Sequence, residues 1–118
     1  GFPQVSGLCF TYNVDREPGD RVTSAVRQAE DGSCTGEPVD LTAASTYTII
    51  SNDFSMAGGD SYPDFSDRVT TLGILDEVVA QYIAGGTPAH PAGEPLTTEI
   101  EGRIVCEGAT CPTPIAAP

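Results

Sequence analysis

The sequence predicts an α+β fold in which a mixed β-sheet carries one amphipathic helix, as a fragment of a larger α/β domain. Three strand-like segments precede a single helical pattern and a fourth follows it, an order that favours a helix packed on a mixed sheet. At 118 residues the chain is one domain at most. It opens on GFPQVSGLCFTYN, a strand already under way. Because domains rarely begin inside a core strand, we expect that the upstream part of the sheet is missing.

The first two strands are expected to form a hairpin. Leu8, Phe10 and Tyr12 fall on one side of residues 5–13, which is the alternation of a half-buried strand. The segment DREPGD then supplies Pro and Gly for a turn, and residues 21–29 have the pattern of a returning strand.

Two further strands are expected downstream. Residues 45–54, STYTIISNDF, form a nearly continuous run rich in Thr, Tyr and Ile, which predicts a central strand. Residues 96–106, LTTEIEGRIVC, place Ile100, Ile104 and Cys106 on one side and predict a closing strand.

The helix is predicted from LGILDEVVAQYIAGG, residues 72–86. Asp76 and Glu77 stand in its first turn, where they complement the helix dipole, and Gly85 with Gly86 stops it. Its apolar residues recur at the spacing of one helix face: Leu75, Val78, Val79, Tyr82 and Ile83.

The charge of the chain excludes one large class of function. Seventeen acidic and five basic residues give a formal net charge of −12, and every basic residue is Arg. Such a surface repels phosphate backbones, so binding to nucleic acid is not expected. The sequence also has no apolar run near the roughly 20 residues that a membrane-spanning helix needs.

The four cysteines predict two disulfides. The segment CEGATC closes a short loop, which favours a local Cys106–Cys111 bond and leaves Cys9 with Cys34. A zinc site is the weaker alternative, because neither spacing matches the CxxC pairs of tetrahedral sites. Buried reduced thiols are also less expected. Disulfides persist in oxidising compartments, so we expect an extracellular, periplasmic or cell-surface location.

Candidate catalytic residues are few. His90 is the one histidine, and its Pro-rich loop is more typical of a solvated surface residue than of a general base. Asp60, Asp64 and Asp67 do not follow the order of a compact calcium loop, so solvated acids are expected there. We therefore expect no catalytic residue, metal or cofactor in this chain.

The segment SNDFSMAGGDSYPDF, residues 51–65, is the clearest candidate for a binding loop. Gly58 and Gly59 permit positive φ and a close backbone approach. Tyr62 follows, and an aromatic ring held after such a turn is a platform on which a base can stack. Spacing alone favours the alternative, a structural turn with Tyr62 packed on the sheet edge.

Five motifs occur in a fixed order: GFPQVSGLCFTYN, PGDRV, YTIISNDFSMAGGDSYPDF, LGILDEVVAQYI and EGRI. Their order and spacing resemble the C-terminal domain of the 5'-nucleotidase family, which includes UDP-sugar hydrolases and 2',3'-cyclic-nucleotide phosphodiesterases. The resemblance extends from Gly1 to Ile104. It implies that residues 1–106 are a partial C-terminal domain and leaves residues 107–118 as a Pro-rich tail with a local disulfide.

The resemblance implies the nucleoside- or nucleotide-recognition part of an exported phosphohydrolase, not catalytic alone. In the family, an N-terminal metallophosphoesterase domain holds two divalent metal ions, and the C-terminal domain clamps the base between two aromatic rings. The metal domain and the second ring are not in this sequence. The alternative is a non-catalytic secreted or cell-surface binding module that kept the scaffold without the enzyme.

Carried over by position, Tyr62 stands where the family has one stacking ring, and Tyr in place of Phe keeps the π face. The resemblance also implies an acid that binds ribose, which is Asp67 or Asp64 here. Within this hypothesis we expect Gly58 and Gly59 to shape the loop. We expect Asn52 and Asp60 to brace it through local hydrogen bonds rather than to contact substrate.

Overall fold

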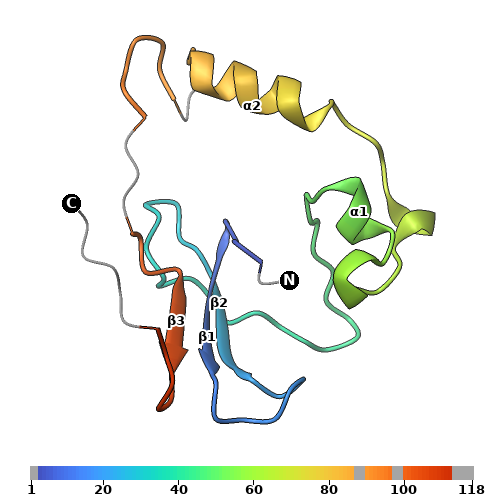
Figure 1. The fold of residues 1–118 in the computed structure, drawn as a ribbon, viewed down its shortest axis with the longest axis vertical. Coiled ribbons are helices and arrows are strands. Elements are labelled where there is room, and N and C mark those ends of the chain that lie inside the picture. Colours follow the sequence, from blue (N-terminus) through green and yellow to red (C-terminus); the bar gives the residue numbers. More distant parts are fainter. Residues whose placement is uncertain (1–2, 87–89, 97–99, 113–118) are drawn as a thin grey trace. The chain divides into compact units, whose positions relative to one another are not determined.

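The computed structural model describes residues 3–86, 90–96 and 100–112, which fall into two compact units. We call residues 3–46 and 100–112 the sheet unit, and residues 47–86 and 90–96 the loop–helix unit (Figure 1). The described residues contain strands, one ten-residue helix and shorter helical turns. The predicted α+β class is confirmed.

The sheet unit is built on three strands in the order β2–β1–β3. β1 (Leu8–Asn13) and β2 (Val22–Arg27) form the expected antiparallel hairpin. β3 (Ile104–Glu107) pairs in parallel with β1, with Phe10 opposite Ile104. The sheet is therefore mixed, as predicted, because its third strand comes from a distant part of the chain and runs in the direction of β1.

The outer edge of β2 is covered by residues 37–39. Arg27 N donates a hydrogen bond to Glu37 O at 2.8 Å, and Val39 N donates to Ala25 O at 2.9 Å. An edge strand with unpaired backbone groups is a template for unwanted pairing with other chains. This segment therefore satisfies the edge of β2 from within the same unit.

Both predicted disulfides are present. Cys9–Cys34 joins β1 to the segment that follows β2 across 25 residues, and Cys106–Cys111 closes a five-residue separation after β3. Cys9 is the one buried apolar residue among the described residues, with 5% of its surface exposed. The Cys9–Cys34 bond therefore lies where the sheet unit comes closest to having a core.

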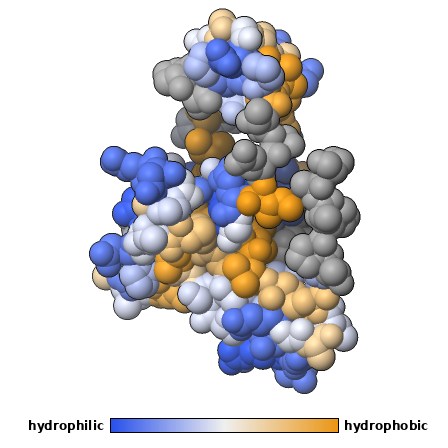
Figure 2. All heavy atoms as spheres, turned by 90° about the vertical axis from the view of Figure 1, so that its left-hand side faces the viewer, coloured by the Kyte–Doolittle hydropathy of each residue, from blue (hydrophilic) through white to orange (hydrophobic). Residues whose placement is uncertain are grey.

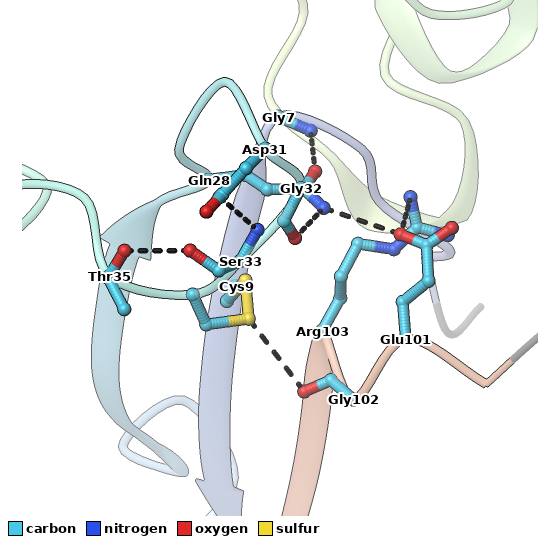
Figure 3. The surroundings of a disulfide bond; sticks show 11 residues. Gly7, Cys9, Gln28, Asp31, Gly32, Ser33, Thr35, Glu101, Gly102 and Arg103 are labelled. Carbon is cyan, nitrogen blue, oxygen red and sulfur yellow. Dashed lines mark hydrogen bonds and ion pairs between the residues drawn. A yellow bond between two sulfur atoms is a disulfide. The ribbon is translucent and has the colours of Figure 1, made fainter.

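Gln28 joins three segments beside this disulfide, as Figure 3 shows. Its Oε1 accepts a hydrogen bond from Gly7 N at 3.1 Å, and its Nε2 donates to Gly32 O at 2.6 Å. Nε2 also lies 3.4 Å from Glu101 Oε2, and the same carboxylate oxygen lies 3.4 Å from Arg103 Nη1. The approach to β1, the turn after β2 and the approach to β3 are thus connected by side chains.

Two predicted segments extend beyond the described residues. Of the closing strand predicted at 96–106, β3 confirms the end, whereas residues 97–99 lie outside the described residues. The tail predicted at 107–118 begins with the Cys106–Cys111 loop, and its residues 113–118 also lie outside the described residues.

The central strand predicted at residues 45–54 is wrong. The segment is irregular up to Asn52 and then enters the short helix α1 (Asp53–Met56). Ile49 and Ile50 are 66% and 83% exposed. β-branched residues favour a strand through contacts with neighbouring strands, and no described strand pairs with this segment. Without that partner, local propensity does not produce a strand.

The predicted helix is confirmed as α2 (Leu75–Ala84). Gly85 ends it with φ +79°, a conformation that favours glycine. Apolar residues reach the molecular surface (Figure 2), and they include all five residues of the apolar face of α2. The packing of this face on the sheet stays a prediction. No helix among the described residues has the length and apolarity needed to cross a membrane.

His90 is buried, so the expectation of a solvated histidine is wrong. The residue is 6% exposed, and its ring centroid lies 5.4 Å from that of Tyr82 in α2. The chain folds back here on the end of the helix, where a Cβ on Gly85 would lie 2.9 Å from Ala92 Cα. Gly85 therefore permits both the helix end and the close approach of the segment that carries His90.

Candidate functional site

The loop singled out in the sequence begins at α1. Asn52 caps this helix, because its Oδ1 accepts a hydrogen bond from Ser55 N at 2.8 Å. Asp53 lies in the first turn, and its Oδ1 accepts from Phe54 N at 2.9 Å. Asn and Asp side chains commonly satisfy backbone amides at helix starts. The Asn52 contact fits the bracing role expected of that residue.

The chain closes on itself after α1. Ala57 and Asp64 form an isolated antiparallel bridge. Next to the bridge, Phe65 N donates a hydrogen bond to Met56 O at 2.8 Å. The residues between Ala57 and Asp64 therefore form a turn whose two ends are joined by backbone contacts.

The tip of this turn contains three left-handed residues. Gly58 has φ +85° and precedes the 3₁₀ turn η1 (Gly59–Ser61), in which Asp60 has φ 54° and Ser61 has φ 67°. Residues other than glycine adopt this conformation at a cost of about 1 kcal/mol or more, and such residues are concentrated at functional sites. Tyr62 follows directly with an extended backbone and an exposed side chain.

Gly59, unlike Gly58, does not have positive φ, and its lack of a side chain permits a close contact with Phe54 instead. A Cβ at this position would lie 2.5 Å from ring atoms of Phe54, so the ring packs directly on the glycine backbone. Phe54 is itself 60% exposed. The loop therefore carries two accessible aromatic side chains, Phe54 and Tyr62. The sequence pattern did not indicate a role for Phe54, although this residue lies within the predicted binding loop at residues 51–65.

The two acids predicted to bind ribose differ in their surroundings. Asp64 Oδ1 accepts a hydrogen bond from Ser66 N at 2.9 Å. Hydrogen bonds from the Ser66 side chain and backbone hold the pKa of Asp64 below its ordinary value. Asp67 lies in the 3₁₀ turn η2 (Ser66–Arg68), and its carboxylate is 80% exposed and 3.6 Å from Arg68 Nε. Asp64 is thus engaged in holding the loop, whereas Asp67 faces solvent.

Metal-binding clusters and surface pockets among the described residues provide no stronger candidate for a binding site than this loop. Among these residues, no group of three or more His, Cys, Asp or Glu side chains is placed to hold a metal ion. A shallow depression lies on the sheet unit, lined in part by Thr11, Ser24 and Arg103, and includes no residue of the candidate loop. It is open and weakly shaped, so we assign the candidate site to the loop.

Replacing Asn52 by Ala is expected to loosen the start of α1, because the Ser55 amide loses its acceptor. Loss of an N-cap of this kind costs about 1 kcal/mol. Amide hydrogen exchange at Ser55 should therefore accelerate roughly fivefold. Asn52→Asp keeps the acceptor and serves as the control. Unchanged exchange in Asn52→Ala would show that the cap does not hold the loop.

Comparison with known proteins gives consistent matches. The sequence profile described as "5'-nucleotidase, C-terminal domain" matches residues 1–67, which include the candidate loop. The chain is 30% identical over 106 residues to the "Trifunctional nucleotide phosphoesterase protein YfkN" of Bacillus subtilis (strain 168), covering 87% of this chain and 7% of that protein. It is 37% identical over 110 residues to "Protein 5NUC" of Lutzomyia longipalpis, covering 91% of this chain and 18% of that protein. The chain thus spans a small part of the length of these relatives. No solved structure matches it.

Proposed function

The chain belongs to the 5'-nucleotidase C-terminal domain family, and from this premise we propose that it is the nucleoside-recognition part of an exported nucleotide phosphohydrolase. Residues 1–106 then form part of the C-terminal domain, and residues 107–118 a Pro-rich tail. Catalysis belongs to a separate N-terminal metallophosphoesterase domain with two divalent metal ions. This chain contributes recognition of the nucleotide and no catalytic group.

The observation that carries this proposal is the strained turn that presents Tyr62. A stacking platform needs an aromatic face that is accessible to solvent and held by a fixed backbone. Tyr62 is 39% exposed and follows two non-glycine residues in the left-handed conformation. The bridge between Ala57 and Asp64 closes the turn around it. Stacking of a base on such a ring is worth about 1–3 kcal/mol.

The surrounding residues support this assignment. Asp67 is the better candidate for the ribose hydroxyls, because Asp64 already accepts hydrogen bonds from Ser66. A carboxylate accepts hydrogen bonds from two neighbouring hydroxyls readily. The remaining residues of the loop have supporting roles: Gly58 and Gly59 shape it, and Asn52 and Asp60 brace it.

The proposed location follows from the two disulfides. Both bonds are formed in the structure. Disulfides are rare in reducing compartments and common in exported proteins. An extracellular, periplasmic or cell-surface location is therefore part of the proposal.

Tyr62→Ala tests the proposed function. We expect it to weaken the binding of adenosine and of adenosine 5'-monophosphate by roughly tenfold, because one stacking surface is lost. Chemical-shift titration of the isotope-labelled chain with millimolar ligand measures this, since a single stacking ring is expected to give weak binding. Tyr62→Phe keeps the π face and should bind like the unaltered chain. Equal affinity in Tyr62→Ala would contradict the stacking role.

A further inference from the structure

The two edges of the sheet differ in their backbone contacts. The outer edge of β2 is hydrogen-bonded to residues 37–39, whereas the order β2–β1–β3 makes β3 the outer strand on the other side (Figure 1). Among the described residues, no strand or isolated bridge lies beyond β3. A strand edge with open amides and carbonyls is a template on which another strand can pair.

The backbone groups at the open edge of β3 can be identified. The carbonyls of Arg103 and Glu107 face β1, because they accept hydrogen bonds at 2.8 and 3.0 Å from amides of β1 and of the residue after it. Backbone groups in a strand alternate between its two sides, so Val105 also faces β1. Ile104 and Cys106 therefore direct their amides and carbonyls toward the open edge.

The loop that follows β3 is held on the β1 side of the strand. Ala109 N donates a hydrogen bond to Asp15 Oδ2 at 2.9 Å, in the turn after β1. A Cβ on Gly108 would lie 2.8 Å from the same oxygen, so the loop packs closely on this turn. The loop closed by the Cys106–Cys111 disulfide thus bends toward β1 rather than over the open edge.

The open edge is complementary to a second copy of itself. A two-fold axis pairs an edge strand with its own copy in the antiparallel direction. In an antiparallel pair, residues with outward backbone groups must lie opposite one another. With Ile104 opposite Cys106 of the second copy, each of these residues both donates and accepts a hydrogen bond. Val105 then lies opposite Val105 of the second copy, on the axis.

The charges favour the same register. It places Arg103 opposite Glu107 of the second copy, and the symmetry repeats this pair. Arg103 and Val105 line the same depression, so they share one face of the sheet, and Glu107 follows on that face by the two-residue period. Opposite charges directly across an antiparallel pair are stabilising. A shift of two residues loses both pairs, and in one direction it brings Glu101 opposite Glu107.

We propose that the open edge of β3 joins two copies of this chain in an antiparallel homodimer. The inference is independent of the proposed function, because it uses no residue of the candidate loop. The dimer is weak, since β3 has only four residues and each copy carries a formal charge of −12. Its symmetry axis passes beside Val105, with the two Arg103–Glu107 pairs on either side.

Sedimentation equilibrium of the full chain at increasing concentration tests the proposal, and we expect a reversible monomer–dimer equilibrium. Glu107→Arg should raise the dissociation constant roughly tenfold, because two Arg side chains then face each other twice. Arg103→Glu should weaken the dimer similarly. An equimolar mixture of the two variants should recover association, since opposite charges meet again in the mixed dimer.

Glu17→Arg is the matched control for charge. It makes the same charge change in the turn between β1 and β2 and should not weaken the dimer. If repulsion between the acidic copies alone governed association, Glu107→Arg would strengthen it. That result would overturn the proposed pairing.

Ile104→Pro tests the hydrogen bonds. It removes an amide that faces away from β1, a position at which proline is tolerated in an edge strand. The dissociation constant should rise roughly tenfold, because two intermolecular hydrogen bonds are lost. In a mixture of isotope-labelled and unlabelled chains, a filtered nuclear Overhauser experiment should detect contact between Val105 Hα atoms of the two copies, whose Cα atoms lie about 4.5 Å apart in such a pair.

Amide exchange separates a second copy from other occupants of the edge. Exchange at Ile104 and Cys106 should slow as the chain concentration rises. Slow exchange that does not depend on concentration would mean that a segment of the same chain covers the edge. A chain that stays monomeric at every concentration, or a dimer that is insensitive to both Glu107→Arg and Ile104→Pro, would equally overturn the inference.

Discussion

Replacing Cys9 and Cys34 together by Ala is expected to lower the free energy of unfolding by about 3.5 kcal/mol. The bond joins two cysteines that are 25 residues apart in the sequence. Its removal lets the unfolded chain explore many more conformations. Domains of this size are stable by about 5–15 kcal/mol, so the loss is a large fraction of the total. Because Cys9 is buried, removing its sulfur also leaves space that the surrounding residues cannot fully close.

The second disulfide provides the comparison. Cys106 and Cys111 are separated by five residues, for which the same chain-entropy relation predicts about 2 kcal/mol. Urea unfolding of the two double-alanine variants without reductant, each against the unaltered chain, measures the difference. An equal or larger loss for the Cys106–Cys111 pair would show that loop length and burial do not set the ranking.

Sequence patterns predicted those parts of the fold that are specified locally. The β1–β2 hairpin has its turn residues between two alternating segments, and α2 has its apolar face, first-turn acids and terminal glycines in one short window. The strand predicted at residues 45–54 was wrong because a strand depends on a partner elsewhere in the chain. The parallel pairing of β3 with β1 is likewise a long-range choice that periodicity alone does not specify.

The candidate loop could be located from sequence, but its geometry could not. Two successive glycines followed by Tyr62 indicated a tight turn that presents a ring. The left-handed conformations of Asp60 and Ser61 were not indicated, because Asp and Ser adopt many turn conformations. The contact of Phe54 with Gly59 was also beyond reach, since it depends on how α1 meets the following turn.

His90 shows why composition misleads about burial. Prolines and glycines around a lone histidine indicate a surface loop, and the segment is indeed a loop. Its side chain is nevertheless covered, because the chain returns to the end of α2 and places the ring against Tyr82. That return depends on Gly85, whose role in ending the helix was predicted but whose role in this contact was not.

Gly36→Ala is expected to destabilise the sheet unit by about 2 kcal/mol, within the range of overpacked interiors. A Cβ at Gly36 would lie 2.2 Å from Arg27 O and 2.9 Å from Arg27 C. These are backbone atoms at the end of β2, so no side-chain rotation relieves the clash. The neighbouring segment must instead move away from β2, and the hydrogen bond from Arg27 N to Glu37 O is then lost or lengthened.

Gly73→Ala is the matched control for this substitution. Its Cβ would lie 3.2 Å from Val78 Cγ2, a side-chain atom that can move, and neither Gly36 nor Gly73 has positive φ. Ala also restricts the unfolded chain more than Gly does, and this stabilising effect offsets part of the cost of crowding Val78 in the folded state. Gly73→Ala should therefore change the free energy of unfolding by less than about 0.5 kcal/mol. Urea unfolding compares the variants, and hydrogen exchange at the Arg27 amide reports the edge of β2 directly. If Gly36→Ala and Gly73→Ala were equally stable and exchange at the Arg27 amide were unchanged, the prediction would be wrong. The segment at residues 37–39 would then contribute little to the stability of the sheet.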